Sequence, residues 1–565
     1  MIDLKGNPFF LSDEDIEWVN KTLNRLTTEE KAAQLFCVLL KRDDKETVDY
    51  IFNILKPGAF MYRVMSTEEA IHATDTVVER SEIYPLIAAN LEKGGNGIVT
   101  EGTLVGSPME IAATDDESIA AKMARACALE AEAVGANWAF APIIDIDSNF
   151  RNPITNTRTF GSDAERVKRM GLAYVKEVQS HGLAATIKHF PGDGRDERDQ
   201  HLVTSINDLS VDEWMKTYGE VYKAGIDKGV LSVMAGHIML PAWEKEMDPA
   251  IKDDDCMPAT LSKALLQGLL REKLGFNGVI STDATTMAGY MLAMGRRRAV
   301  PESIARGCDM FLFARNLEED YHFMLDGIKE GIITKERLDE AVTRILAMKA
   351  ALGLHKKTDR PDPKRAKEII GCPQHKEWAR ECADKAITLV KEEKGVLPIT
   401  PEKYKRILLY RIEPVGEGYS IYKTNPVIDR VKDKLIKEGF EVDEFEPQPY
   451  GEGFTSKYEE ITSKYDLMLY VANLATKSNQ TVVRIEWKQP MGADCGLYIN
   501  DVKTVFVSLE NPYHLLDFPR VKTFINCYSG NDEVVDELIK KLTGKSEFKG
   551  KSPIDPFCGR LDTRL

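Results

Sequence analysis

Short apolar runs alternate with amphipathic stretches along the first part of the chain, and this alternation constrains the fold most. Segments such as Glu117–Val134 and Asp163–Ser180 repeat apolar residues at three- and four-residue spacing, as amphipathic helices do. Eight strands that alternate with helices predict a (β/α)8 barrel of the TIM type. The eight apolar runs are Leu35–Leu40, Gly58–Tyr62, Leu86–Leu91, Trp138–Ile143, Ala184–His189, Leu231–His237, Gly278–Thr282 and Met310–Ala314.

A second alternating region follows a stretch rich in Lys, Asp and Pro that begins at Lys356 and is typical of a linker. Its shorter pattern predicts a smaller α/β sandwich domain with a mostly parallel sheet. We therefore expect a catalytic barrel over residues 1–355, a linker over 356–374 and a C-terminal α/β sandwich over 375–565. The expected elements of the second domain are strands Ile407–Tyr410, Asp466–Val471, Thr504–Ser508 and Val521–Cys527 and helix Val427–Glu438.

Composition limits the partners that this chain can have. The formal net charge is -15, which argues against nucleic acid or an anionic membrane as the main partner. No run of about 18 apolar residues is present, and the mixed start of the sequence does not resemble a signal peptide. The nine cysteines are dispersed without a C-x-x-C pair, as expected of reduced thiols. We expect a cytoplasmic protein with no membrane partner.

A polar loop follows the fifth apolar run, where Lys188–Gly194 reads KHFPGDG. Pro and Gly break regular structure there, and loops held by a rigid strand are frequent sites of chemistry. Asp199 and His201 follow, separated by one residue. That spacing lets the carboxylate hold one imidazole nitrogen while the other nitrogen faces a substrate. A solvated surface loop is the alternative interpretation.

KHFPGDG followed by Asp199-Gln200-His201 resembles glycoside hydrolase family 3, in particular its β-N-acetylglucosaminidase branch. That branch usually shows KHFPGHG and then a D-x-H pair, so Asp193 departs from the pattern while the pair itself is intact. The segment Ala386–Ile399 also resembles the entry to the family's second domain. The resemblance implies a retaining, exo-acting β-N-acetylglucosaminidase (a β-N-acetylhexosaminidase) whose partner is a small carbohydrate, an N-acetylglucosaminide.

The seventh apolar run ends in a single carboxylate, Asp283. From the residues alone, Asp283 is equally a helix cap or a catalytic group. The resemblance favours catalysis, because Gly275–Gly278 precedes Asp283 as in the family's nucleophile motif. Retaining cleavage needs one group that attacks the anomeric carbon and one that protonates the leaving oxygen. The family pattern assigns Asp283 as nucleophile, His201 as acid/base and Asp199 as the residue that orients His201.

The resemblance also implies a set of sugar-binding residues. Lys188 and His189 match the family's substrate-binding pair, Arg158 matches an R-[ST]-F-G motif, and Asp145 matches an A-P-x-x-D stretch. The remaining candidates come from a looser match to A-x-D-x-E-G-G, in which either Asn90 or Glu92 binds sugar and Glu92 is preferred. The last two candidates are therefore Glu92 and His237. His237, at the end of its run, either faces the pocket or is a core histidine with its hydrogen bonds satisfied.

No cofactor or metal is expected, because the sequence has no H-x-H, H-E-x-x-H, Walker A or G-x-G-x-x-G pattern. Other functions remain open. A β-N-acetylglucosaminide phosphorylase would use the same residues with phosphate as acceptor, and a family 3 β-glucosidase usually takes its acid/base from elsewhere. A non-catalytic sugar-binding protein and a metal-dependent barrel hydrolase are the remaining alternatives. The aglycone (a peptidoglycan fragment, chitobiose or another group) and the oligomeric state are not specified by the sequence.

Overall fold

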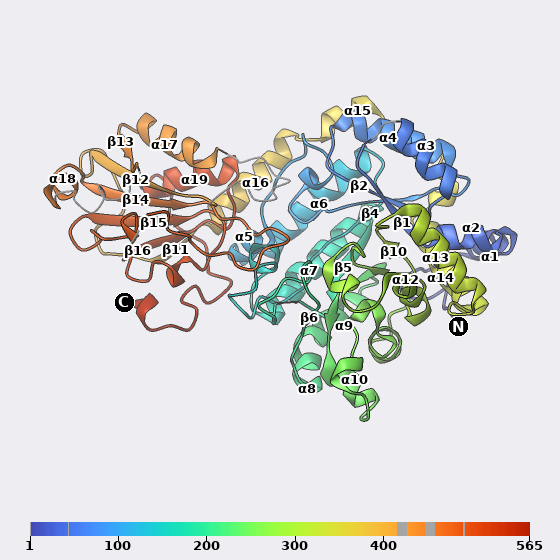
Figure 1. The fold of residues 1–565 in the computed structure, drawn as a ribbon. Helices are drawn as coiled ribbons and strands as arrows, with labels where there is room; N and C mark the ends of the chain where they lie inside the picture. Colours follow the sequence, from blue (N-terminus) through green and yellow to red (C-terminus); the bar gives the residue numbers. More distant parts are fainter. Residues whose placement is uncertain (1, 43–44, 415–425, 447–457, 490–491) are drawn as a thin grey trace. The chain divides into compact units, whose positions relative to one another are not determined.

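The computed structural model describes residues 2–42, 45–414, 426–446, 458–489 and 492–565 (Figure 1). The chain divides into two compact units. The first unit comprises Met1–Val105, Ala120–Asn152 and Asp163–His375. The second unit comprises Gly106–Ile119, Pro153–Ser162 and Lys376–Leu565. Two short excursions of the chain thus pack with the second unit before the long C-terminal segment joins it.

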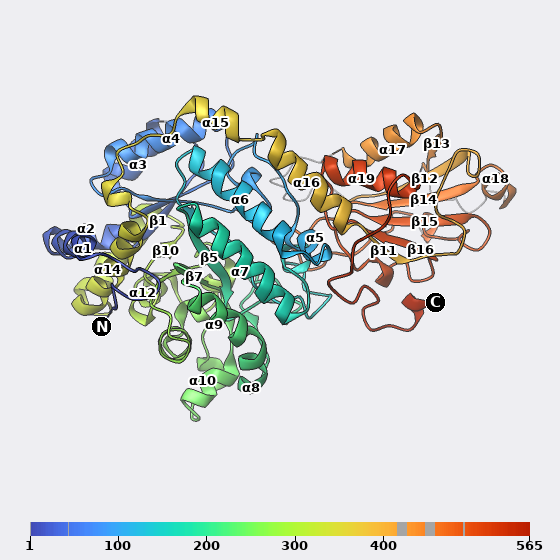
Figure 2. The ribbon, with the colours of Figure 1, turned by 180° about the vertical axis from the view of Figure 1, so that it is seen from behind.

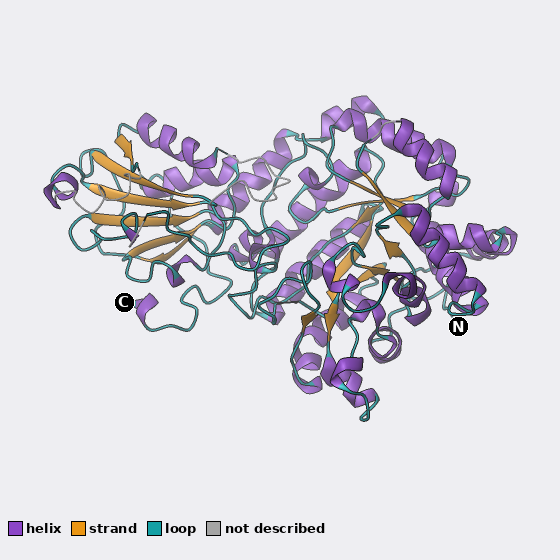
Figure 3. Cartoon of the chain, viewed as in Figure 1, coloured by secondary structure: helices purple, strands orange, loops and turns teal. Residues whose placement is uncertain are grey.

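The first unit is a parallel barrel that confirms the predicted fold class (Figure 3). Its eight strands pair in the order β10-β1-β2-β3-β4-β5-β7-β9. A bridge between Ser281 and Met310 nearly closes the ring by joining β9 to β10. The strands are β1 (Phe36–Leu40), β2 (Ala59–Tyr62), β3 (Leu86–Ala89), β4 (Trp138–Ala139), β5 (Ala184–Phe190), β7 (Ser232–Ala235), β9 (Val279–Thr282) and β10 (Phe311–Leu312).

Amphipathic helices cover the outside of these strands (Figure 2). Local sequence fixes where they begin. At α4, for example, the Ser66 side chain accepts from the Glu69 amide while the Glu69 side chain accepts from the Ser66 amide, which is a capping box. The main outer helices are α3 (Lys45–Ile54), α4 (Thr67–Arg80), α6 (Glu117–Ala133), α7 (Ala164–Ser180), α9 (Glu220–Asp227), α12 (Arg296–Arg306), α13 (Leu317–Lys329) and α14 (Lys335–Ala351).

A buried ion-pair network ties the outer layer to the joint between β9 and β10. Asp309 lies just before β10, is fully buried, and contacts Arg271 at 2.6 Å and Arg337 at 2.7 Å. Its Oδ2 also accepts from the Ile280 amide at 2.9 Å. Burial alone would raise the pKa of Asp309, but the surrounding guanidinium groups lower it below its ordinary value. This carboxylate is therefore charged and fully engaged in the native state.

The second unit contains a six-stranded mixed sheet in the order β11-β16-β15-β14-β12-β13. β11 is antiparallel to β16, and the other neighbours are parallel. Apolar clusters lie on both faces of the sheet, as expected of an α/β sandwich. Its elements are α16 (Pro373–Ala386), β11 (Thr388–Lys391), β12 (Arg406–Ile412), α17 (Val427–Lys437), β13 (Glu441–Glu444), β14 (Leu467–Ala472), β15 (Lys503–Ser508), β16 (Thr523–Asn526) and α19 (Asp532–Leu542).

The segment expected to be a linker, 356–374, contains the helix α15 (Pro363–Ile369) and the first residues of α16. The expected domain boundaries themselves stay a prediction. Within the described ranges, no helix combines the length and the apolar character that crossing a membrane requires.

Candidate active site

Most of the predicted site residues lie at one end of the barrel. Glu92 and Asp145 follow β3 and β4, Lys188 and His189 lie in β5, and Asp283 directly follows β9. Parallel strands present their carboxyl ends at the same rim, which is where TIM-type barrels carry their sites. The strand order therefore gathers residues that are far apart in the sequence.

Asp145 and His189 form a buried pair next to Asp283. The His189 backbone N–H donates to Asp145 Oδ1 at 3.0 Å, and His189 Nδ1 lies 2.7 Å from Asp145 Oδ2. Because the carboxylate holds Nδ1, the other ring nitrogen points to the nucleophile candidate: Nε2 lies 3.9 Å from Asp283 Oδ2. The two residues that the sequence nominated separately as sugar binders thus act as one carboxylate–imidazole unit.

Asp283 is held in a turn that leaves its carboxylate partly exposed, with 14% of the side chain accessible. Its amide donates to Ala235 O at 2.8 Å, and the Ala284 amide donates to its Oδ1 at 2.7 Å. Burial tends to raise the pKa of Asp283, but the nearby imidazoles, His189 foremost, and the Ala284 N–H lower it below its ordinary value. The carboxylate is therefore ionised at neutral pH, as a nucleophile must be.

The helix-cap interpretation of Asp283 does not match the structure. The next helix, α11 (Ala288–Met291), begins later, and its N-cap residue is Met287, which makes no side-chain capping bond. The Asp283 side chain is therefore available for another role.

Lys188 and Glu92 form a second buried contact at this rim. Lys188 Nζ donates to Glu92 Oε1 at 2.8 Å, and the two side chains are only 3% and 13% exposed. Asn90, the alternative sugar binder, is exposed. The ion pair thus brings Glu92 into the cluster with Lys188 and His189.

The dyad predicted from the D-x-H spacing is formed. His201 Nδ1 lies 2.7 Å from Asp199 Oδ1, and the His201 amide donates to the same oxygen at 2.8 Å. The Asp199 side chain is fully buried, whereas 24% of the His201 side chain is exposed. Since Asp199 engages Nδ1, the exposed Nε2 is the nitrogen that can exchange a proton with a substrate.

The loop that carries the dyad is fixed to the start of α11, which follows the turn that carries Asp283. The Ala288 amide donates to His201 O at 3.0 Å, and Thr204 Oγ1 donates to Gly289 O at 2.8 Å. A Cβ at Gly289 would lie 2.4 Å from Gln200 O, so this approach requires glycine. His201 is also among the imidazoles that lower the pKa of Asp283. The dyad and the carboxylate therefore belong to one site.

His237 lies beneath this turn. It is fully buried, with Nδ1 3.0 Å from Thr260 Oγ1 and Nε2 3.0 Å from Ala284 O. Burial lowers the pKa of His237, so the ring is neutral. Both ring nitrogens are engaged, which matches the alternative of a satisfied core histidine. Direct binding of sugar by His237 stays a prediction that this geometry does not support.

Arg158 is the one predicted residue that lies outside the first unit. It ends the short 3-10 helix η2 (Asn156–Arg158) in the segment Pro153–Ser162, which packs with the second unit. Its Nη1 lies 3.4 Å from Ile154 O. The role of Arg158 in binding sugar stays a prediction.

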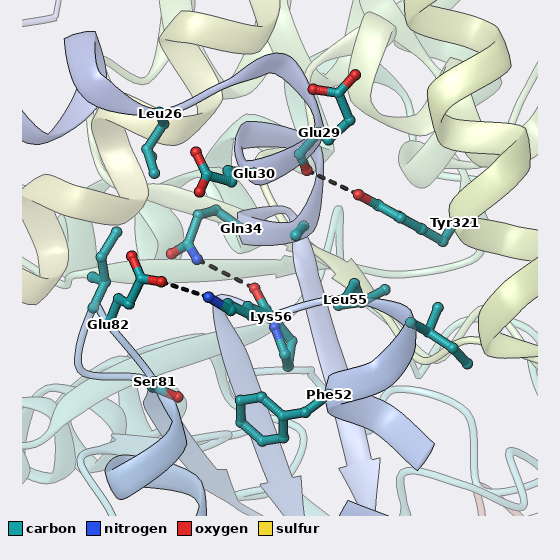
Figure 4. Close-up of a pocket in the computed structure, with 14 residues that line it drawn as sticks. Leu26, Glu29, Glu30, Gln34, Phe52, Leu55, Lys56, Ser81, Glu82 and Tyr321 are labelled. Carbon is teal, nitrogen blue, oxygen red and sulfur yellow. Dashed lines mark hydrogen bonds and ion pairs between the residues drawn. The ribbon is translucent and has the colours of Figure 1, made fainter. Parts of the chain in front are cut away.

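A pocket of about 250 Å³ lies at the opposite end of the barrel (Figure 4). Gln34, Pro57 and Ile83 line it, and they lie two or three residues before β1, β2 and β3. Its polar groups are engaged with one another, since Lys56 Nζ donates to Glu82 and Tyr321 OH donates to Glu29 O. Among the described residues, no group of three or more His, Cys, Asp or Glu is placed to hold a metal ion.

Comparison with known proteins identifies the class. Residues 27–348, more than half of the chain, match the family model described as "Glycosyl hydrolase family 3 N terminal domain". The protein belongs to glycoside hydrolase family 3, and is a glycosidase that acts on β-linked sugars.

Two full-length relatives carry different names. A "Beta-N-acetylglucosaminidase/beta-glucosidase" from Cellulomonas fimi is 49% identical over 569 residues, which covers 100% of each chain. A solved structure titled "Beta-glucoside phosphorylase BglX" is 46% identical, covers 99% of each chain and superposes with a TM-score of 0.93. A family 3 β-N-acetylglucosaminidase from Paenibacillus sp. str. FPU-7 shares the fold, with a TM-score of 0.78 at 24% identity over 94% of this chain and 99% of that one.

Proposed function

We propose that the protein is a retaining, exo-acting enzyme that removes a terminal β-linked N-acetylglucosamine through a covalent glycosyl–Asp283 intermediate. The observation that carries the proposal is the Asp199–His201 dyad, attached through Ala288 and Gly289 to the turn that presents the ionised Asp283. Two groups of these types, one nucleophilic and one able to exchange a proton, are what retaining cleavage requires.

In the first step, Asp283 Oδ2 attacks the anomeric carbon while the bond to the leaving oxygen breaks. His201 Nε2 gives its proton to that oxygen, and the imidazole becomes neutral. Asp199 holds Nδ1 at 2.7 Å, so the ring keeps the tautomer and orientation that this transfer needs. In the second step, His201 takes a proton from the acceptor, which attacks the same carbon and releases Asp283 as a carboxylate.

Binding of the sugar is assigned to the buried polar groups around Asp283. Lys188, fixed by Glu92 at 2.8 Å, offers N–H donors to hydroxyls, and His189, fixed by Asp145, lies 3.9 Å from the nucleophile. Pre-fixed donors lose little conformational entropy when substrate binds. Arg158 is retained as a further donor to the sugar on the strength of its motif.

The sugar specificity is tested by incubating the protein with 4-nitrophenyl β-N-acetylglucosaminide and with the matching β-glucoside. We expect cleavage of the first with a larger kcat/KM, and a first-formed sugar product of unchanged anomeric configuration by NMR. A preference for the glucoside would overturn the proposed substrate, and an inverted product would overturn the covalent mechanism.

The role of His201 is tested by its dependence on the leaving group. His201→Ala should lower kcat/KM far more for N,N'-diacetylchitobiose than for the nitrophenyl glycoside, because nitrophenolate leaves without protonation. His181→Ala is the matched control, since His181 is the C-cap residue of α7 and pairs with Glu177 at 3.2 Å on the outer layer. An equal loss on both substrates would indicate that His201 only binds.

A second candidate concerns the acceptor: phosphate in place of water. It is supported by the name of the 46% identical relative, a β-glucoside phosphorylase, and by the histidine acid/base. An ionised glutamate in this role would repel an anion, whereas a neutral imidazole would not. Arg198 adds little positive potential, because it is paired with Asp196 at 2.7 Å. Lys188, although bonded to Glu92, adds a buried positive charge to the site.

The acceptor is identified by running the reaction with and without millimolar phosphate and following the products by NMR. Phosphorolysis predicts the sugar 1-phosphate and a rate that rises with phosphate. Free sugar as the sole product, at a rate independent of phosphate, would make the protein a plain hydrolase.

We assign the protein to the cytoplasm as part of the same proposal, since all nine cysteines are free.

A further inference from the structure

Two buried side chains, Asp193 and Gln200, contact each other. They lie between the Asp145–His189 pair and the loop that carries His201. Asp193 is 3% exposed and Gln200 is 1% exposed. Gln200 is the middle residue of the D-x-H motif, where the motif itself specifies no residue type. A spacer has no reason to bury a primary amide, because burial is costly unless each polar atom finds a partner.

Asp193 is attached to the pair beside the nucleophile. Its backbone N–H donates to Asp145 Oδ1 at 2.7 Å, and the same oxygen accepts from the His189 amide. Its own Oδ1 accepts from Asn152 Nδ2 at 3.0 Å and from the Gly194 amide at 2.6 Å. The carboxylate is thereby locked in one orientation, with Oδ2 directed to the loop that carries His201.

Gln200 completes the connection. Its Nε2 lies 3.5 Å from Asp193 Oδ2, and its Oε1 accepts from the His237 amide at 2.9 Å. His237 Nε2 in turn lies 3.0 Å from Ala284 O, the residue after the nucleophile. A chain of contacts therefore runs from Asp145 through Asp193, Gln200 and His237 to the Asp283 turn.

Burial, followed by the charge of Asp145, raises the pKa of Asp193 well above its ordinary range. Only the N–H donors around Asp193 can hold its charged form. The Gln200 amide, whose Nε2 lies 3.5 Å from Asp193 Oδ2, has no freedom to turn over, because its oxygen already accepts from the His237 N–H.

We propose that Asp193 and Gln200 form a brace that positions His201 relative to Asp283, so that both are positioning residues for glycoside cleavage. This inference deepens the proposed function and rests on it. The brace acts through His201, because Gln200 lies between Asp199 and His201 in the chain. Its loss should therefore impair proton transfer to the leaving oxygen more than it impairs substrate binding.

In the contact between Asp193 and Gln200, the hydrogen-bond donor and the acceptor can be exchanged by substitution. In Asp193→Asn, the side-chain oxygen must still accept from Asn152 and Gly194, so the new amide nitrogen faces the Gln200 nitrogen, donor against donor. In Gln200→Glu, two carboxyl groups face each other, and the amide donor to Asp193 Oδ2 is lost. The double variant restores a donor and an acceptor, with the roles exchanged, and the new carboxylate can still accept from the His237 amide.

The experiment measures kcat/KM of the native protein, both single variants and the double variant on N,N'-diacetylchitobiose and on 4-nitrophenyl β-N-acetylglucosaminide. A buried mismatch of this kind is expected to lower kcat/KM on the disaccharide by about tenfold to hundredfold in each single variant. The nitrophenyl glycoside should lose less, and the double variant should recover to within about fivefold of native. A double variant no better than the worse single variant would overturn the brace.

Gln34→Glu is the matched control, because Gln34 is a buried glutamine at the opposite end of the barrel that bonds Lys349 and Lys56 O. It should leave the ratio of the two substrates unchanged. If the single variants do not fold, as judged by thermal unfolding, Gln200→Met carries the test, since it keeps the volume and removes the amide. A uniform loss on both substrates would then refute the brace. Failure of the native protein to cleave either substrate would instead refute the proposed function.

Discussion

Asp199→Asn should lower activity far less than the replacement of an orienting carboxylate does when that replacement changes the tautomer of the histidine. Two donors of His201, the backbone N–H at 2.8 Å and Nδ1 at 2.7 Å, converge on the same Asp199 oxygen, Oδ1. The backbone N–H can only donate, so the new amide must place its oxygen there. That oxygen then also accepts from Nδ1–H, and the tautomer of His201 is preserved.

What Asp199→Asn does lose is the negative charge of the Asp199 carboxylate. A hydrogen bond to a charged acceptor is worth about 1.5–3 kcal/mol and a neutral one about 1 kcal/mol. The difference of about 0.5–2 kcal/mol corresponds to roughly a 2–30-fold drop in rate. A wrong tautomer would cost about 10⁴-fold, as in a serine-protease triad. Asp199→Ala, which leaves the partly buried His201 amide without this acceptor, should be worse than Asp199→Asn.

The assay compares kcat/KM on N,N'-diacetylchitobiose for native protein, Asp199→Asn, Asp199→Ala and His201→Ala. Thermal unfolding controls for loss of fold. A loss in Asp199→Asn as large as that of His201→Ala would show that the amide turns over and that the shared-oxygen argument is wrong. Native activity in Asp199→Asn would show that the charge has no part in catalysis.

Three further outcomes follow from the same contacts. Asp283→Ala should lower turnover by several powers of ten while calorimetry still detects binding of an N-acetylglucosamine-based inhibitor; loss of binding as well would contradict a nucleophilic role. Glu92→Ala removes the carboxylate that Lys188 contacts and should raise KM and destabilise by about 3–5 kcal/mol; an unchanged KM and melting temperature would exclude the ion pair. Asp309→Asn should destabilise by about 3–5 kcal/mol at pH 7. The lowered pKa of Asp309 means that its contribution is present above about pH 4 and is lost as pH falls below that value, so equal destabilisation at pH 7 and pH 3 would refute it.

The strands that line the barrel could be predicted because each is a buried apolar run, and parallel strands covered on both faces read this way. In the second unit, β13 (Glu441–Glu444) is not predicted, because a four-residue edge strand with three acidic residues has no such signal. β11 (Thr388–Lys391) was missed because it is short and its burial is incomplete. Hydrophobic periodicity identifies residues that are buried. An edge strand is defined instead by its backbone hydrogen bonds to the neighbouring strand.

The sequence indicates which residues form the site, but it does not indicate which of them contact each other. The D-x-H spacing anticipated the bond between Asp199 and His201, because both partners lie within one tight turn. The pairing of Asp145 with His189 and of Glu92 with Lys188 joins different strands, and only strand order brings these together. Gln200 carried no local signal, since the importance of its amide depends on partners elsewhere in the fold.

The close approach of Gly289 to the Gln200 carbonyl has a consequence for how this catalyst can change. A methyl group at position 289 would separate the proton donor's loop from the nucleophile's turn, although neither loop would lose a reacting atom. Grafting an acid/base loop from another barrel would therefore fail unless the α11 segment were transplanted with it. The loop that carries His201 and the segment that follows Asp283 would therefore have to change together for the site to keep its geometry.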